Sequence, residues 1–467
     1  MRRTIGAMRG LAGAGLAALV LSTAACGSSG SSIAGAPGGD AARLVPRDAL
    51  AFVSVNADLD TKQWQRLDDL TRGLPARERI VRMVHEALAK EQLDFDRDVR
   101  PGIGPELDLA VLGVENGEPE VVALAQPEDE AKLKSLAYLY STGSDHYTVE
   151  EVGDWSVVAD SRKAFEDVRA ARDGRSLSDQ PPFQAASSQL GDDAIARVYV
   201  DGAAARRLPP DLRSFVRAAG NPAWAAASLV VEDEALRLRV AVDRTGTTPA
   251  PYAPRLLREV PSGASLAISF RGLDQLVSRL GAEPAFASLA NDVRDYLGIG
   301  VGELAPLLRG EGVIYARGAG ILPVLALELE SRHPAEAARV LRRVAARLGS
   351  RAGALLTLSV TTRPGRVILA TSPQAAAGLG ASGPKLVDDQ RFKDALANAD
   401  VPDQVTGLVY ADVGELLPLI EAAAAAFGKP FSRDTETNLQ RLRTLVAYGT
   451  ADSSAARFEA WLQLGGH

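Results

Sequence analysis

Short runs of apolar and β-branched residues, each bounded by turn-forming residues, recur along the chain and predict β-strands. In the first half they are Ala51–Val55, Leu107–Val114, Glu120–Ala125, Ser156–Ala159, Ile195–Val200 and the pair Ala225–Glu232 and Ala235–Val242. In the second half they are Leu266–Phe270, Val313–Ala316, Val324–Leu329, Leu355–Thr361, Val367–Thr371, Gly407–Ala411, Leu445–Thr450 and Arg457–Leu464. Several runs follow one another without a helix between them, which favours antiparallel pairing over a doubly wound sheet.

Five segments instead show the 3.6-residue period of an amphipathic helix. They are Arg77–Glu91, Glu128–Leu139, Ala203–Ala219, Pro334–Leu348 and Val413–Phe427. Together the two patterns predict an α+β protein. We expect each half to form a largely antiparallel sheet of roughly six to eight strands with helices packed on one face.

The chain also resembles itself at a long interval. Five collinear matches relate its halves: Leu44–Val55 with Glu259–Phe270, Gly102–Leu107 with Gly298–Leu304, Trp155–Ser161 with Arg366–Ser372, Asp179 and Phe183 with Asp388 and Phe392, and Val198–Asp201 with Val409–Asp412. Because their order is preserved, the matches predict two homologous α+β repeats, 45–245 and 256–467. The Pro- and Thr-rich segment 246–255 has the composition of a linker.

The N-terminus carries the strongest local pattern. It consists of basic residues, an apolar stretch and small residues before the only cysteine (Arg2, Arg3 and Arg9; Leu11–Leu21; Ala25; Cys26). Such a segment is typical of a secretory signal peptide, and its apolar stretch is too short to cross a bilayer. The small residues before Cys26 resemble the lipobox of bacterial lipoproteins.

That resemblance implies removal of residues 1–25 by cleavage between Ala25 and Cys26, followed by acylation of Cys26, with palmitate among the acyl chains. Residues 26–44 are rich in Gly, Ser and Ala and predict a flexible tether. We therefore expect a protein anchored by lipid to the extracytoplasmic face of the cell membrane. The alternative is a plain secretory signal that happens to end in cysteine.

Composition and charge exclude several classes of protein. The 467-residue chain has 52 Lys and Arg against 59 Asp and Glu, a net charge of −7. An acidic body does not favour a nucleic-acid partner. A single cysteine excludes a disulfide scaffold. At about 150 residues per domain, the length predicts two or three domains.

No catalytic, cofactor-binding or metal-binding site is expected. The four histidines lack further ligands at metal-binding spacing on a common face: His85, His146, His333 and His467. The segments Gly102–Gly104 and Gly298–Gly302 complete neither a dinucleotide-binding nor a phosphate-binding motif, and they predict tight turns.

Four aspartates recur in the two halves. Asp179 and Asp388 each precede an apolar helical segment, which predicts helix N-caps with Phe183 and Phe392 packed inward one turn later. Asp201 and Asp412 each end a strand, and they also suit helix caps.

Several motifs together are similar to those of a bacterial envelope family known as "domain of unknown function 3352". They are the lipobox, V-P-R-D-A-L-A-F-V-S-V-N-A-D (45–58), W-S-V-V-A-D-S (155–161), S-L-S-D-Q-P-P-F (176–183) and A-R-V-Y-V-D (196–201). The resemblance covers nearly all of the mature chain and is clearest in its first half. It implies an exported, membrane-tethered protein without an established activity, and it supplies no catalytic residues.

Three functions remain open. The first is a non-enzymatic scaffold or interaction module, joined to membrane lipid through acylated Cys26 and able to bind an envelope partner. The second is a carrier of a lipid or another hydrophobic ligand in an apolar cavity. The third is an envelope hydrolase in which acids such as Asp201 and Asp412 converge in a cleft.

Overall fold

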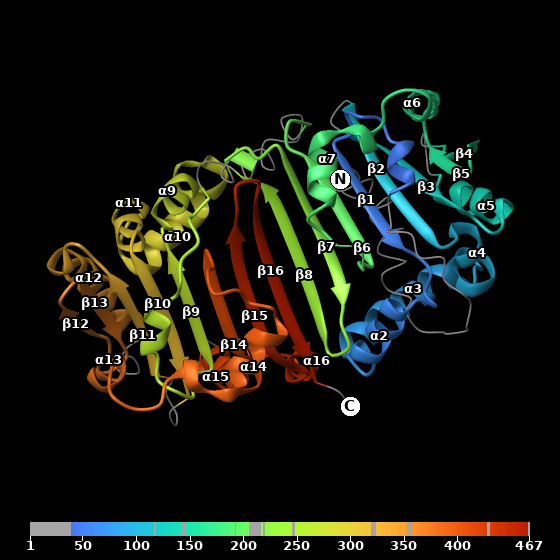
Figure 1. Ribbon diagram of the computed structural model, residues 1–467. Coiled ribbons are helices and arrows are strands. Elements are labelled where there is room, and N and C mark those ends of the chain that lie inside the picture. The colour runs from blue at the N-terminus through green and yellow to red at the C-terminus, as the bar shows by residue number, and fades with distance from the viewer. Residues whose placement is uncertain are drawn as a thin grey trace. The chain divides into compact units, whose positions relative to one another are not determined.

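The computed structural model describes residues 39–465, except 116–117, 142–145, 192, 205–215, 218–219, 245–247, 319–323, 353–356 and 427–429. The chain divides into two compact units. Unit 1 contains the residues up to Arg213 together with Pro222–Asp243, and unit 2 is mainly Arg244–Gly465. Each unit is described by itself below (Figure 1).

In its described residues, unit 1 contains an eight-stranded antiparallel sheet in the order β4-β5-β3-β2-β1-β6-β7-β8. The strands are β1 (Ala51–Asn56), β2 (Glu106–Glu115), β3 (Glu118–Ala125), β4 (Thr148–Val152), β5 (Trp155–Ala159), β6 (Ala196–Asp201), β7 (Trp224–Val231) and β8 (Ala235–Asp243). The helices are η1 (Ala41–Arg43), α2 (Lys62–Thr71), α3 (Pro75–Lys90), η2 (Phe95–Val99), α4 (Arg100–Ile103), α5 (Glu130–Tyr140), α6 (Arg162–Asp173), η3 (Leu177–Asp179) and α7 (Pro181–Ser187).

The described residues of unit 2 likewise form an eight-stranded antiparallel sheet, in the order β12-β13-β11-β10-β9-β14-β15-β16. The strands are β9 (Leu266–Arg271), β10 (Glu311–Arg317), β11 (Val324–Glu330), β12 (Ser359–Arg363), β13 (Arg366–Ala370), β14 (Gly407–Asp412), β15 (Leu442–Ala451) and β16 (Ala455–Leu464). The helices are η5 (Leu256–Glu259), α9 (Asp274–Ala282), η6 (Pro284–Phe286), α10 (Ala287–Leu297), α11 (Val301–Leu304), η7 (Ala305–Leu308), α12 (Pro334–Ala352), α13 (Pro373–Gly378), η9 (Leu386–Asp388), α14 (Gln390–Asn398), α15 (Val413–Ala426) and α16 (Arg433–Gln440).

The two sheets have the same strand order when β1 to β8 are matched one by one with β9 to β16. Local details match as well. Ser161 caps α6 by accepting a hydrogen bond from the N–H of Ala164, and Ser372 caps α13 by accepting one from the N–H of Ala375. This arrangement is compatible with the expected tandem repeat.

The predicted α+β class and the largely antiparallel sheets are confirmed, but helices cover both faces of each sheet rather than one. In unit 1, the cross-strand partners Phe52 and Tyr199 share a face with Phe183 of α7. Val55 lies on the opposite face and packs in a core with Trp64 of α2 and residues of α3 and α5. The sheet presents buried apolar side chains on both faces, so each face needs its own cover.

In unit 2, helices likewise cover both faces of the sheet. Phe392 of α14 packs against Tyr410 on one face of the sheet. Phe270 belongs to the other face, in a core with Leu341 and other residues of α12. Alternate side chains of a strand point to opposite faces, which explains how one strand serves two cores.

The folded part of unit 1 includes some of the residues that were predicted to form the tether, 26–44. Ala41 and Ala42 of η1 are fully buried and Leu44 is 5% exposed. The Ala-rich composition resembles a linker, but small side chains also fit a tight contact between backbone segments. The expected tether therefore overlaps the fold, and the rest of it lies outside the described residues.

The expected linker 246–255 also contributes to the fold. Tyr252 is 4% exposed and exchanges two backbone hydrogen bonds with Val405, of 2.8 and 3.0 Å. Its hydroxyl lies 2.8 Å from the hydroxyl of Ser269 on β9. One aromatic residue thus anchors a segment whose Pro and Thr content indicates a linker.

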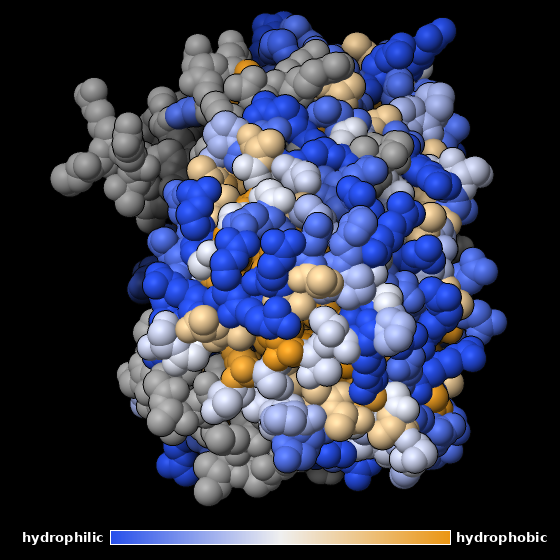
Figure 2. Space-filling model, turned by 90° about the vertical axis from the view of Figure 1, so that its left-hand side faces the viewer, coloured by the Kyte–Doolittle hydropathy of each residue, from blue (hydrophilic) through white to orange (hydrophobic). Residues whose placement is uncertain are grey.

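The outer strand of each sheet carries polar or charged side chains. β12 exposes Thr361 and Thr362, and β4 exposes Glu151. Such residues discourage an edge from pairing with another chain. The side of unit 2 that carries α12, β12 and α13 is mainly hydrophilic, with a small hydrophobic area (Figure 2). Among the described residues, no helix is both long and apolar enough to span a bilayer.

Candidate functional site

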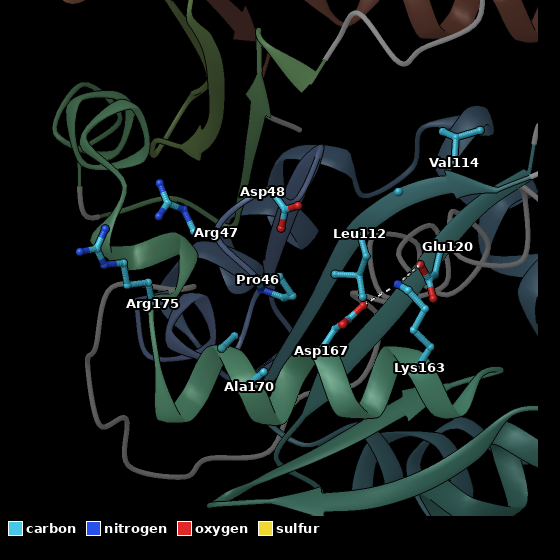
Figure 3. A pocket seen from close by; sticks show the side chains of 12 residues that line it. Pro46, Arg47, Asp48, Leu112, Val114, Glu120, Lys163, Asp167, Ala170 and Arg175 are labelled. Carbon is cyan, nitrogen blue, oxygen red and sulfur yellow. Dashed lines mark hydrogen bonds and ion pairs between the residues drawn. The ribbon is translucent and has the colours of Figure 1, made fainter.

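A solvent-open pocket of about 500 Å³ lies in unit 1, between the turn before β1, the strands β2 and β3, and α6 (Figure 3). Its charged lining residues come from separate parts of the chain: Arg47, Asp48, Glu120, Lys163, Asp167 and Arg175. Pro46, Leu112 and the small residues Ala170 and Ala171 supply apolar surface. A second pocket of about 470 Å³ shares Arg47 and Arg175.

One end of the pocket is organised around Lys163. Its ammonium lies 2.6 Å from Oδ2 of Asp167 and 3.3 Å from Oε2 of Glu120. The bond with Asp167 and the negative charge of Glu120 raise the pKa of Lys163. Glu120 is held in place by Ser161, whose hydroxyl donates to its Oε1 over 3.1 Å. Lys163 is therefore satisfied by carboxylates of this chain.

A β-bulge shapes the floor of the pocket. The pairing of β2 with β3 shifts between Val111 and Gly113, so Leu112 is an extra residue in β2. The matching pair in unit 2, β10 with β11, is regular. Bulges re-aim side chains and are frequent next to functional sites. The bulge places Leu112 and Gly113 in the wall of the pocket.

The other end of the pocket holds Arg47 and Arg175, which follow and precede an isolated antiparallel bridge between Pro46 and Ser176. Figure 3 shows both guanidinium groups at the same end, away from Lys163. Both residues are exposed. The pocket is thus cationic at one end and rich in carboxylates at the other.

The aspartates of the recurring Asp and Phe motif are not the N-cap residues that the sequence predicts. Asp179 ends η3 rather than capping α7, and its Oδ2 accepts hydrogen bonds from the backbone N–H and the hydroxyl of Ser176, over 2.9 and 3.0 Å. Asp388 ends η9, and the N-cap position of α14 belongs to Asp389. The N-cap assignment was wrong because a 3-10 turn precedes each helix.

The two phenylalanines pack inward. Phe392 is 2% exposed, and its ring centroid lies 5.0 Å from that of Tyr410. Phe183 is half-buried between Phe52 and Tyr199. The predicted inward packing is confirmed, and these residues are structural.

Asp201 and Asp412 each accept a hydrogen bond from the backbone N–H three residues later. Oδ1 of Asp201 accepts from the N–H of Ala204 over 2.8 Å. Oδ1 of Asp412 accepts from the N–H of Glu415 in the first turn of α15 over 3.1 Å. The predicted capping is confirmed for Asp412, whereas the helix expected after Asp201 lies mostly outside the described residues.

The tight turns predicted at the glycine motifs are confirmed at Gly104 and Gly298, which end α4 and α10, whereas Gly102 and Gly302 lie within α4 and α11. A Cβ on Gly102 would lie 3.0 Å from Leu136, and one on Gly104, whose φ is +77°, would lie 1.9 Å from the carbonyl oxygen of Gln126. Gly298 ends α10 with a φ of +72°. The close approaches explain Gly102 and Gly104, and the positive φ explains Gly298, without a phosphate ligand.

The remaining sequence candidates form no site. Within the described residues, no group of three or more His, Cys, Asp and Glu side chains could hold a metal ion. His85, His146 and His333 lie on α3, before β4 and before α12. His467, Ala25 and Cys26 lie outside the described residues.

Sequence reasoning missed several buried carboxylates. Asp108 on β2 is fully buried, and burial together with the negative charge of Glu106 raises its pKa well above the usual range. In unit 2, Glu328 is fully buried and burial raises its pKa. Both lie inside predicted strands, where alternation alone predicts an apolar side chain at a buried position.

Glu311 on β10 is 1% exposed. Its Oε1 accepts from the N–H of Leu256 over 2.6 Å, and its Oε2 lies 3.4 Å from Nε of Arg255. Arg366 pairs with Glu328 over 3.3 Å and with Glu259. These carboxylates attach the η5 segment to the sheet, which is a structural role.

Comparison with known proteins adds a family but no activity. Residues 4–151 match the family model described as "Protein of unknown function (DUF3352)". The match is shorter than the expected resemblance to nearly all of the mature chain, and it ends within β4. No curated protein and no solved structure matches the chain. The chain is therefore similar, over its residues 4–151, to the DUF3352 family of proteins of unknown function.

Proposed function

We propose that the chain is an exported, lipid-anchored protein of the cell envelope that acts by binding, as a non-enzymatic scaffold or interaction module. The observation that carries the proposal is the N-terminal pattern of basic residues, apolar stretch and small residues ending at Cys26. The family match starts at residue 4 and therefore includes Arg9, the apolar stretch and Cys26. Cys26 is the only cysteine, so it is the single candidate for thioether acylation.

The folded units support a binding role. The pocket of unit 1 is open to solvent and holds charged groups at both ends, which suits recognition of a polar ligand. Asp201 and Asp412, the acids that an envelope hydrolase would use, each accept a hydrogen bond from a backbone N–H. Asp412 also pairs with Arg391 over 3.5 Å, and among the described residues neither carboxylate is hydrogen-bonded to a second acid or base of the kind that such catalysis requires.

The carrier alternative needs an apolar cavity of roughly 300 Å³ or more. The pockets described in unit 1 are lined by arginines, a lysine and carboxylates instead. Burying an acyl chain against charged side chains gains little of the hydrophobic free energy that drives lipid binding. We therefore favour the interaction module.

Fractionation of cells that express the full chain tests the anchor. We expect the wild type in the membrane fraction, degraded by protease added outside the cytoplasmic membrane. Cys26→Ala should keep the full precursor length and lose incorporation of an alkyne-labelled palmitate. Ser31→Ala, a change within the same Gly/Ser-rich segment, is the matched control and should behave as wild type. Equal labelling of Cys26→Ala and wild type would refute the anchor.

A further inference from the structure

The Arg47–Arg175 end of the pocket is a like-charge pair built into the fold. Pro46 pairs with Ser176 in an antiparallel bridge. The residue after Pro46, Arg47, therefore lies across from the residue before Ser176, Arg175. The hydrogen bond of 2.8 Å from the N–H of Leu177 to the carbonyl of Val45 fixes the register on the other side of the bridge. Like charges directly opposite one another destabilise such a pair.

Neither arginine is neutralised by the protein. Among the described residues, no carboxylate lies within ion-pair distance of either guanidinium. Asp179, which lines the second pocket together with both arginines, accepts two hydrogen bonds from Ser176 through its Oδ2. Those bonds, with a smaller effect from the charge of Arg175, lower the pKa of Asp179. The pair therefore keeps two adjacent positive charges with donors free for a ligand.

The fold does not require these charges. In unit 2, Pro261 and Lys385 form the matching bridge, so the residues opposite each other are Ser262 and Pro384. The N–H of Ser262 donates to the carbonyl of Pro384 over 3.1 Å. The same backbone arrangement is therefore stable without arginine at either position.

Other charged residues that line the pocket of unit 1 are also replaced by uncharged residues at the matching positions of unit 2. Counting from the caps Ser161 and Ser372, Lys163 and Asp167 on α6 correspond to Gln374 and Gly378 on α13. The β-bulge beside Leu112 is likewise absent from the matching strands of unit 2. Charge, bulge and cavity thus occur together at one place in unit 1, and the equivalent positions on α13 carry no charge.

We propose that this pocket binds a phosphate-bearing ligand, with the phosphate between Arg47 and Arg175 and a hydroxyl-rich part directed toward Asp48, Asp167 and Glu120. A phosphate monoester carries about −1.5 to −2 charges at neutral pH, which matches two guanidinium groups. Arginine binds phosphate oxygens in a bidentate fashion. The carboxylates around Lys163 repel a second phosphate and accept hydrogen bonds from hydroxyl groups.

The inference deepens the proposed function, on whose binding role it rests, by naming the class of ligand that the pocket of unit 1 takes. If no probe binds, this inference fails, whereas the lipid anchor fails only if Cys26→Ala is labelled like the wild type. The phosphate could belong to a soluble phosphomonoester or to a lipid headgroup. The test uses the full chain in dodecyl maltoside without phosphate buffer, and isothermal titration calorimetry with two probes. Glycerol 3-phosphate represents the soluble source, and a short-chain phosphatidic acid represents the headgroup.

We expect one-to-one binding of at least one probe, weakened at least about tenfold in Arg47→Ala and in Arg175→Ala, since a hydrogen bond to a charged group is worth that much. Arg82→Ala, which removes an exposed arginine of α3, is the matched control and should bind as wild type. Binding of glycerol 3-phosphate identifies a soluble source, and binding of phosphatidic acid alone identifies a headgroup.

A second readout separates binding from folding. The melting temperature of the wild type should rise with the bound probe, whereas that of Arg47→Ala should not respond. Without any probe, Arg47→Ala should be at least as stable as wild type because a like-charge contact is removed. The proposal is overturned if neither probe binds the wild type at about 10 mM, or if Arg82→Ala weakens binding as much as Arg47→Ala does.

Discussion

Phe183 of α7 meets Tyr199 of β6 edge to face, with ring centroids 5.1 Å apart and ring planes at 80°. Phe392 of α14 meets Tyr410 of β14 in the same way, at 5.0 Å and 79°. Each pair fastens the helix after a 3-10 turn to the strand that follows it in the chain. Burial raises the pKa of Tyr410 to about 12, as expected for a phenol in an apolar core.

Truncating the two phenylalanines should have unequal effects, because Phe392 is buried and Phe183 is half-buried. We expect Phe392→Ala to cost about 3–5 kcal/mol and Phe183→Ala to cost about 1–3 kcal/mol of unfolding free energy. Urea unfolding followed by tryptophan fluorescence measures both. Equal costs would contradict the assigned packing.

Gly104 and Gly302 should respond to alanine with opposite signs. Gly104 has φ +77° and no room for a Cβ, so Gly104→Ala should destabilise unit 1 by at least ~2 kcal/mol. Gly302 lies in α11 with nothing within 4 Å, so Gly302→Ala should stabilise by about 0.5–1 kcal/mol. Thermal melting of the two variants checks the contrast. A tolerated Gly104→Ala would refute the tight turn.

Asp108 should make unit 1 less stable as the pH rises. Burial raises its pKa in the folded state, so above the unfolded value of about 3.9 the folded state holds a proton that the unfolded state releases. Stability is therefore lost from that pH upward until the folded-state pKa is passed. Asp108→Asn, which removes the titration, should be more stable than wild type by about 1–3 kcal/mol at pH 8 and no more stable at pH 4.

The half-buried Asp98 is a control for which stability should change with pH in the opposite direction. The side chain of Arg97 lowers its pKa to about 2, so its contribution is present above the unfolded pKa and is lost as the pH falls toward 2. Asp98→Asn should therefore reduce stability at neutral pH and have little effect at pH 2. Urea titrations at several pH values measure both variants. A gain for Asp108→Asn that is independent of pH would argue against a titrating buried carboxyl.

Glu311 should stabilise the fold mainly through its hydrogen bond with the N–H of Leu256 and only slightly through its ion pair with Arg255. Glu311→Ala removes the acceptor of a buried N–H, and we expect a loss of about 1–3 kcal/mol. Glu311→Gln keeps an amide oxygen for that bond and should cost clearly less. Arg255→Ala removes a guanidinium that is 66% exposed and should cost under ~1 kcal/mol. Chemical denaturation ranks the three, and a dominant loss in Arg255→Ala would reverse the assignment.

The strands were largely predictable because their apolar runs and turn boundaries are local features of the sequence. β4 was missed because its edge position leaves Glu150 and Glu151 among its five residues, which weakens the apolar pattern. α6 was missed because its charged residues hide a narrow buried stripe that includes Phe165 and Val168. The expected helix 203–219 lies mostly outside the described residues.

The candidate pocket could not be predicted from spacing. It needs the bulge at Leu112 and a bridge between segments that are far apart in sequence, at Pro46 and Ser176. The sequence does not show that Arg47 and Arg175 lie opposite each other, because only the folded chain brings the two together. A buried Tyr252 in a Pro- and Thr-rich segment was equally hidden, since composition records no tertiary partner.

The central claim is that the mature chain begins at an acylated Cys26. Mass spectrometry of the N-terminal peptide, released by trypsin from protein extracted from cell membranes, tests it most directly. We expect a peptide that starts at Cys26, lacks residues 1–25 and carries the added mass of a diacylglyceryl group, with or without a third acyl chain. A peptide that retains residues before Cys26, or one that starts at an unmodified Cys26, would contradict the account.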